Sequence, residues 1–411
     1  MASDAKALRV LTFVLTLMIW QTAGDQASGE PAAPNSECVS AFDPGADYFP
    51  HKVDIRHAEG FDVSYHGHYK VVTVYSPGNE GERAKDVMVL VQCGAPAPAL
   101  TGDIAGATLI DIPARTLGAN EDLSLNRARA LGFADRIIAM GSEGVYAPEI
   151  RRRWESGEVM LIGASFHGPP NFEKLLTRPP DVLFLSTASV SSPSASIHRS
   201  RDLGLPAVPS VSWMEPTPLG QAEWLHLTAV FLNAEARSAA VFSQIEERYV
   251  TLSQKARAQA SRPTVVWLDA ARQRDQWVVP ETNWMARLID DAGGRSPWGR
   301  PGGAPTRTVT SEQILALGDG VDAMVTTSAG LAKPGSTGPL ERAPAIMDNR
   351  FYDVHRRSLP ESDAYDWYES AVVEVDQVLA DFVALLHPDL APDHEFHHIR
   401  RARASAKRPS E

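Results

Sequence analysis

The sequence predicts an α/β protein of two lobes joined by a long α-helix, and three observations support this fold class. Residues 218–260 contain no glycine after Gly220 and no proline after Pro218, and apolar residues recur there with helical spacing. On both sides of this stretch, short β-branched runs are followed by helical patterns. The chain has 411 residues, 44% hydrophobic and 22% charged, which is enough for two globular cores.

The linking region, residues 220–260, is expected to form two consecutive helices. The first is predicted from about Gln221 to Leu232, and the second from Ala234 to Ala260. The second helix carries an apolar stripe with spacings of three and four residues: Phe242, Ile245, Tyr249, Leu252 and Ala256. Such a helix would be roughly 40 Å long. That length exceeds what one small lobe needs, so the helix is expected to span two.

Residues 48–100 predict a β-rich extension of the first lobe. Strands are expected in the runs VDIRHA, FDVSYH, YKVVTVYS and DVMVLVQC. Gly67, between His66 and His68, is expected to form a hairpin turn. We interpret the two histidines as residues at the edges of this turn rather than as metal ligands.

Residues 101–219 alternate short strands with helices and form the predicted N-terminal lobe. In an open α/β sheet, ligands bind at the loops beyond the carboxyl ends of the strands. Those loops are expected at residues 118–120, 141–146, 163–167, 186–192 and 212–215.

The C-terminal lobe is predicted over residues 261–390 and is followed by a tail, 391–411. It begins with the apolar strand PTVVWLDA, and the next run, ARQRDQWVVPETNW, is interpreted as a loop rich in arginine and tryptophan. The run DWYESAVVEVDQVLADFVALLH is expected to be the final amphipathic helix.

The segment PLGQAEWLHLTAVFLNAEARSAAVFSQIEERY resembles the lobe-linking region of periplasmic substrate-binding proteins of ABC importers, in the class that takes ferric siderophores, haem or cobalamin. The similarity extends from about Tyr48 to His398 and includes the run DAYDWYESAVVEVDQVLADFVALLHPDLAPDHEF. It implies two Rossmann-like lobes in the class III periplasmic binding protein fold. It also implies capture of an iron complex such as a ferric siderophore, with cobalamin or haem as the alternative. We expect a monomer that is not an enzyme and has no cofactor or metal site.

The resemblance also implies a partner, a membrane permease. It matches Glu173 and Glu312 to two glutamates, one on each lobe, that form salt bridges with arginines of the permease. Each lies near the start of a predicted helix, with Asn171 or Thr310 as N-cap, so helix capping is the alternative role. A binding protein that serves a sensor instead of an importer is a further alternative.

Ligand contacts are expected from both walls of the cleft between the lobes. Indole rings offer area to a large chelate, and arginine offers charge and planar hydrogen bonding. The candidates are Trp213, Arg199 and Tyr146 from the first lobe and Arg274, Trp277 and Trp284 from the second. Trp213 and Trp277 rank highest because each follows a predicted strand. Trp367 is a weaker candidate, and core packing is the alternative for each tryptophan.

An enzymatic alternative rests on the run His394-Glu395-Phe396-His397-His398. It satisfies the pattern H-E-x-x-H, in which two histidines one helical turn apart bind zinc beside a general base. A zinc hydrolase using His394, Glu395 and His398 is therefore the competing class of function.

The N-terminus predicts export. Lys6 and Arg9 precede an apolar run from Val10 to Trp20, which is shorter than the roughly 20 residues that span a bilayer. Residues 1–24 are therefore interpreted as a cleaved signal peptide, with an uncleaved anchor as the alternative, and 25–47 as a flexible leader. We expect a periplasmic protein without a lipid anchor, because Cys38 does not directly follow a small-residue signal motif.

Charge and cysteine content restrict the remaining partners. The formal charge of -12 argues against nucleic acid or an anionic membrane surface as partner. Cys38 and Cys93 are the two cysteines, and an oxidising compartment favours a disulfide between them. Two separate buried thiols are the alternative.

Overall fold

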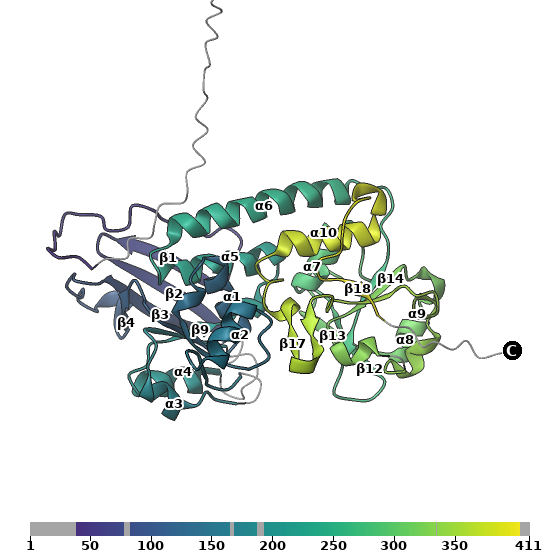
Figure 1. The fold of residues 1–411 in the computed structure, drawn as a ribbon. Coiled ribbons are helices and arrows are strands. Elements are labelled where there is room, and N and C mark those ends of the chain that lie inside the picture. Colours follow the sequence, from purple (N-terminus) through teal and green to yellow (C-terminus); the bar gives the residue numbers. More distant parts are fainter. Residues whose placement is uncertain (1–37, 78–82, 165–167, 187–192, 334, 403–411) are drawn as a thin grey trace, which may run out of the picture.

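The protein consists of two α/β lobes bridged by one long helix, as the sequence predicts (Figure 1). This computed structural model describes residues 38–77, 83–164, 168–186, 193–333 and 335–402. The predicted signal peptide and most of the predicted leader lie outside the described residues. Within the described ranges, no helix is both long and apolar enough to cross a membrane.

The N-terminal extension is a four-stranded sheet in the order β1-β2-β3-β4. Its strands are β1 (Phe61–His66), β2 (Tyr69–Pro77), β3 (Arg83–Gln92) and β4 (Thr108–Ile112). The first three are antiparallel, and β4 runs parallel to β3. The predicted turn at Gly67 is confirmed: Gly67 has φ +64 and His66 pairs with Tyr69. The strand Thr108–Ile112 thus belongs to this sheet and not to that of the first lobe.

The expected strand VDIRHA is wrong. The backbone amides of Arg56, His57 and Ala58 donate to the carboxylate of Glu223, at 2.9, 2.7 and 2.6 Å. Glu223 is fully buried in the linking region. Because these amides are taken by a side chain, the segment cannot use them in a strand ladder.

The leader is joined to the extension by a disulfide bond between Cys38 and Cys93, whose Cα atoms lie 4.7 Å apart. The backbone amide of Val39 also donates to the carbonyl of Cys93, at 2.8 Å. At Gly94, with φ +85, a Cβ would come within 2.1 Å of the Val39 carbonyl oxygen. This close approach requires glycine.

The first lobe is built on a five-stranded parallel sheet in the order β7-β6-β5-β8-β9. Its strands are β5 (Leu117–Ala119), β6 (Ile137–Met140), β7 (Met160–Leu161), β8 (Val182–Ser186) and β9 (Ala207–Ser210). Its helices are α1 (Asp122–Ala130), α2 (Pro148–Glu155), α3 (Phe172–Thr177) and α4 (Pro193–Asp202). All residues of β6, β8 and β9 are buried, as expected for a sheet covered on both faces.

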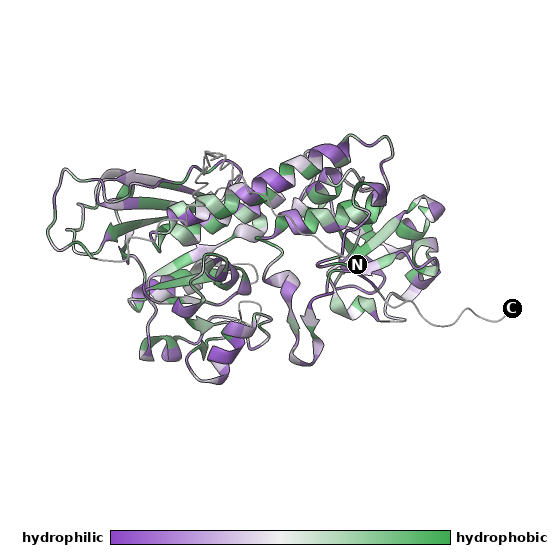
Figure 2. Ribbon diagram, turned by 45° about the horizontal axis from the view of Figure 1, so that its top comes forward, coloured by the Kyte–Doolittle hydropathy of each residue, from purple (hydrophilic) through white to green (hydrophobic). Residues whose placement is uncertain are grey.

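Two helices link the lobes, α5 (Pro218–Val230) and α6 (Glu235–Arg257). The predicted stripe on α6 is confirmed, since Phe242, Ile245, Tyr249 and Ala256 are buried and Leu252 packs against them. Figure 2 shows hydrophilic and hydrophobic residues alternating along this helix. Helix α5 contributes to both cores: Leu219 packs in the C-terminal core and Leu225 in the N-terminal one. The link is therefore packed into both lobes.

The second lobe has a four-stranded sheet, β10-β14-β15-β18, a three-stranded sheet, β11-β12-β13, and a hairpin of β16 and β17. The strands are β10 (Val265–Trp267), β11 (Asp269–Ala270), β12 (Gln276–Pro280), β13 (Thr306–Thr310), β14 (Ala323–Thr326), β15 (Phe351–Asp353), β16 (Ser358–Leu359), β17 (Ala364–Tyr365) and β18 (Arg400–Arg401). The helices are α7 (Trp284–Asp291), α8 (Ser311–Leu315), α9 (Pro344–Met347) and α10 (Val375–Leu386).

Two expectations for this lobe are wrong. The predicted loop 271–284 contains strand β12, in which the β-branched pair Val278-Val279 faces β13. The predicted final helix begins only at Val375, because residues 366–374 form a short 3-10 helix, η10 (Asp366–Tyr368), and a turn.

Candidate functional site

A cavity of about 540 Å³ lies between the two lobes and is the candidate binding site. Its size falls within the range of small-molecule sites. Both lobes contribute walls, and Gln221 of α5 lies between them. Its surface is mostly apolar.

The N-terminal wall comes from the carboxyl end of the parallel sheet. Each of the five predicted strand-exit loops supplies a residue: Asn120 after β5, Ser142 after β6, Ala164 after β7, Ser186 at the end of β8 and Trp213 after β9. The prediction that ligand-binding loops gather at this edge of the sheet thus agrees with the cavity.

Close packing and hydrogen bonds hold these loops together. The Asn120 side-chain oxygen accepts from the Ser186 amide at 2.8 Å. A Cβ on Gly141 would lie 2.5 Å from the Asn120 carbonyl oxygen, so the loops after β5 and β6 can approach only because residue 141 is glycine. Trp213, 42% exposed, projects from this wall.

The C-terminal wall is aromatic. Trp284 starts α7, and Trp367 and Tyr368 belong to η10. The rings of Trp284 and Trp367 stack with their centroids 6.0 Å apart. Both rings also contact the buried Trp267, with centroid distances of 6.1 and 6.0 Å. The Tyr368 hydroxyl donates to the Thr327 carbonyl at 2.8 Å.

The loop after β14, which carries Thr327, is anchored by one carboxylate. Asp269 accepts hydrogen bonds from the Thr327 amide at 2.9 Å, the Thr327 hydroxyl at 2.5 Å and the Ser328 hydroxyl at 3.0 Å. Side chains fixed in this way lose little conformational freedom when a ligand binds.

The charged groups of the cavity are acidic. Glu121 caps α1, and its carboxylate accepts from the Ser124 amide at 3.1 Å. Burial raises the pKa of the neighbouring Asp122 well above its usual range, and the charges of Glu369 and Glu121 raise it further. None of the described residues that line the cavity is lysine, arginine or histidine.

Beside the cavity, Glu369 connects the two lobes. Its carboxylate accepts from the backbone amides of Tyr146 and Ala147, the second at 3.0 Å. Burial raises the pKa of Glu369 to about 7, although the two amide donors lower it. In the same region, a Cβ on Gly144 would lie 2.9 Å from the Asp363 carbonyl oxygen. The lobes therefore touch through polar backbone contacts at this end of the cavity.

The structure brings some of the predicted ligand residues into the cavity and excludes others. Trp213 and Trp284 line it, as does the weaker candidate Trp367. Trp277 does not, because in β12 its ring faces the core and its Nε1 donates to the Ser311 hydroxyl at 2.9 Å. Arg199 on α4 and Arg274 before β12 are exposed outside the cavity.

Tyr146 also lies outside the lining. Its amide is bound by Glu369, and the Arg357 guanidinium lies 5.6 Å from its ring centroid, so it belongs to the contact between the lobes. Tyr368 was not among the sequence candidates. It lies near the start of a run that the sequence analysis interprets as one continuous helix. In the structure this part of the run is the 3-10 helix η10, which brings Tyr368 to the cavity.

Glu173 and Glu312 are both exposed in the first turn of a short helix, α3 and α8. The caps are made by Asn171, which accepts from the Lys174 amide, and by a reciprocal Thr310–Gln313 capping box. The carboxylates themselves are thus not needed as caps. Helices α3 and α8 lie on different lobes, on the side of the molecule away from α6 (Figure 1).

The H-E-x-x-H pattern does not form the helical zinc motif. Residues 394–398 contain no helix. His394 Nε2 lies 2.7 Å from Asp381 Oδ1, and the amides of His397 and His398 also bind the Asp381 carboxylate. The alternative hydrolase site built on His394, Glu395 and His398 therefore lacks its geometry.

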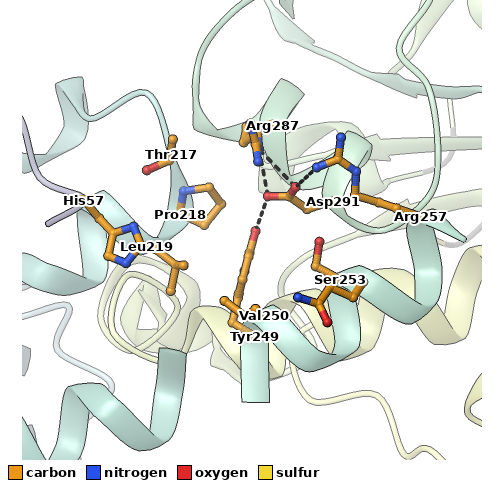
Figure 3. A pocket seen from close by; sticks show the side chains of 11 residues that line it. His57, Thr217, Pro218, Leu219, Tyr249, Val250, Ser253, Arg257, Arg287 and Asp291 are labelled. Carbon is orange, nitrogen blue, oxygen red and sulfur yellow. Dashed lines mark hydrogen bonds and ion pairs between the residues drawn. The ribbon is translucent and has the colours of Figure 1, made fainter. Parts of the chain in front are cut away.

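A second pocket, of about 320 Å³, lies beside α6 and α7 (Figure 3). Its charged side chains are already paired: Arg287 and Arg257 contact Asp291 at 3.0 and 3.4 Å. The Tyr249 hydroxyl donates to the same carboxylate at 2.9 Å. We interpret this pocket as a packing feature between the helices.

Comparison with known proteins identifies relatives in sequence and structure. A family model described as periplasmic binding protein matches residues 131–339. An uncharacterized lipoprotein of Methanocaldococcus jannaschii is 24% identical over 253 residues, which is 59% of this chain and 56% of the relative. The chain thus matches little more than half the length of this curated relative.

Solved structures share the fold. A periplasmic binding protein from Veillonella parvula superimposes with a TM-score of 0.52 at 11% identity, covering 80% of this chain and 98% of that one. A periplasmic haem-binding protein from Pseudomonas aeruginosa gives a TM-score of 0.50 at 14% identity, covering 67% and 93%.

Proposed function

The chain belongs to the periplasmic binding protein family, and from this premise we propose that it captures a metal chelate between its lobes and delivers it to the permease of an ABC importer. The observation that carries the proposal is the interlobe cavity, with three indole rings on its two walls. Aromatic faces give a large ligand contact area at little cost in conformational entropy. An iron complex remains the first candidate, with cobalamin or haem as the alternative.

The charge of the cavity narrows the class of chelate. Its described lining carries Glu121 and Asp122 and no cationic side chain. The raised pKa of Asp122 favours its neutral form, so the charge argument rests on Glu121. The buried Glu121 carboxylate disfavours an anionic ligand, because like charges repel strongly where water is excluded. We therefore favour a neutral or cationic chelate, such as a ferric hydroxamate or a corrinoid, over a strongly anionic ferric catecholate.

The test is quenching of tryptophan fluorescence in the purified protein by a ferric hydroxamate, cobalamin, haem and a ferric catecholate. We expect saturable binding of a neutral or cationic chelate and at least tenfold weaker binding of the catecholate. Replacing Trp213, which is 42% exposed and has little packing role, by alanine is expected to reduce affinity about tenfold, the typical effect of losing one aromatic anchor.

Trp298→Phe is the control, since Trp298 packs in the C-terminal lobe away from the cavity. Preferential binding of the anionic catecholate would contradict the assigned ligand class. Equal affinity of the Trp213→Ala variant and the wild type would contradict the assigned site.

A further inference from the structure

A cluster of four metal-binding side chains lies outside the cavity. Asp366, Glu374, His397 and His398 each offer one ligand atom, and these atoms all lie within 4.8 Å of one another. They come from three segments: η10, the residue before α10, and the residues before β18. The fold therefore brings them together from distant parts of the C-terminal lobe.

The cluster leaves buried polar atoms without partners. His398 has no exposed surface, and neither of its ring nitrogens has a hydrogen-bond partner among the described residues. Asp366 is equally buried, and its Oδ1 also lacks one. Buried polar groups are nearly always satisfied, so the unpaired Asp366 Oδ1 and one unpaired nitrogen of His398 indicate a missing partner in the cluster.

The distances suit a metal ion better than direct hydrogen bonds. His398 Nε2 lies 3.9 Å from Glu374 Oε2, and His398 Nδ1 lies 4.0 Å from Asp366 Oδ2, both beyond hydrogen-bond range. His397 Nε2 lies 3.2 Å from Glu374 Oε2. Only one of the two His398 nitrogens can bind the ion. Ligands bound tetrahedrally to zinc at about 2.0–2.1 Å are about 3.4 Å apart. The four ligand atoms lie within 4.8 Å of one another, so they would have to move together by at most roughly 1.4 Å to complete the shell.

Charge also favours a cation. Arg357 Nε donates to Asp366 Oδ2 at 2.9 Å, and its guanidinium contacts His397. This single positive group faces two carboxylates, which leaves one negative charge in excess. A guanidinium has only donors, and it does not reach His398, so it cannot satisfy the cluster alone.

We propose that Asp366, Glu374, His397 and His398 form a binding site for one divalent transition-metal ion, with the ligand set of Zn²⁺. Two imidazoles and two carboxylates are ligands that zinc commonly takes. Because four protein ligands fill a tetrahedral shell, the site is structural and not catalytic.

The position of the site gives it a role in shaping the cavity. Asp366 is directly followed by Trp367 and Tyr368, which line the cavity, and by Glu369, which binds the other lobe. A metal ion that ties η10 to the C-terminal histidines fixes this wall. The inference does not depend on which chelate the cavity holds.

The test is calorimetric titration of the chelator-treated, purified protein with Zn²⁺ alone. We expect one equivalent to bind. Glu374→Gln and His397→Gln each remove a ligand from a side chain that is about one third exposed, so the fold should persist, and we expect at least tenfold weaker binding. His51→Gln is the matched control, because His51 is exposed in the N-terminal extension, away from the cluster.

Thermal unfolding provides a second readout. A ligand that binds the folded state raises the melting temperature, so Zn²⁺ should stabilise the wild type and the His51→Gln variant but not Glu374→Gln. Absence of saturable binding to the wild type would overturn the proposal. Equal binding by all four proteins would also overturn it, since it would indicate surface histidines such as His66 and His68.

Discussion

At the scale of single residues, Glu369 is the carboxylate that links the two lobes. Its carboxylate binds two backbone amides of the opposite lobe, yet burial raises its pKa to about 7. The protonated carboxyl is therefore favoured in the folded protein more than in the unfolded chain. This contribution to stability is complete below the ordinary glutamate pKa of 4.5 and is lost as the pH rises toward 7.

Replacing Glu369 by glutamine should remove this pH dependence. Between pH 4.5 and 7.5, we expect the unfolding free energy of the wild type to fall relative to that of Glu369→Gln by on the order of 3 kcal/mol. Urea denaturation at several pH values measures the difference, with Glu361→Gln, an exposed glutamate nearby, as control. A difference between wild type and Glu369→Gln that stays constant with pH would disprove the assignment.

At the scale of elements, α6 acts as a continuous brace. Its 23 residues contain no break, and its buried stripe packs against α5 and α10. The helix is roughly 35 Å long, and it contacts the cores of both lobes, since Val241 packs against each. Bending it would disturb both cores.

Ser243, exposed on this helix, allows a direct test of the brace. Ser243→Pro removes an internal hydrogen bond and introduces a steric clash, and we expect it to lower the unfolding free energy by about 3 kcal/mol or more. Ser243→Ala keeps the helix and should change stability by less than about 1 kcal/mol. Similar urea midpoints for the two variants would show that the helix is not needed intact.

The elements that sequence predicted best are those whose pattern is local. The stripe from Phe242 to Ala256 and the strand-exit loops at Asn120, Ser142 and Trp213 were predictable, because periodicity and sheet topology place them without distant partners. The strand expected at residues 53–58 failed because Glu223, far along the chain, takes its amides. Long-range hydrogen bonds of this kind leave no local pattern.

The candidate site was predictable only in part, for the same reason. Trp277 and Trp284 have similar surroundings in sequence, but β12 turns one ring toward the core while α7 places the other in the cavity. Arg199 and Arg274 were proposed from chemistry that a chelate could require. The acidic lining at Glu121 and Asp122 could not be predicted, because the place of these residues beside the cavity depends on how the strands of the sheet pair.

At the scale of the whole molecule, two exposed acids mark the side opposite α6. Glu173 on α3 and Glu312 on α8 lie on different lobes, and neither makes the cap of its helix. We propose that arginines of the permease bind them, so that the transporter senses the separation of the lobes. Surface ion pairs of this kind weaken with salt.

Charge reversal tests this docking surface. In cells that carry the importer, we expect Glu173→Lys combined with Glu312→Lys to reduce uptake of the chelate at least tenfold, because like charges would face each other across the interface. Chelate affinity in vitro should not change, since neither residue lines the cavity. Glu247→Lys, on the exposed face of α6, is the control. Normal uptake by the double variant would show that the permease does not dock on these two carboxylates.

Residues beyond the carboxyl edge of the parallel sheet form most of the first lobe's cavity wall, and the strands behind them contribute only Ser186, the last residue of β8. Substitutions at Ser142, Ala164 and Trp213 should thus change which ligand binds without disturbing the Asn120–Ser186 hydrogen bond that holds the loops together. A protein built in this way can change its ligand preference through a few substitutions in its loops while its core stays the same.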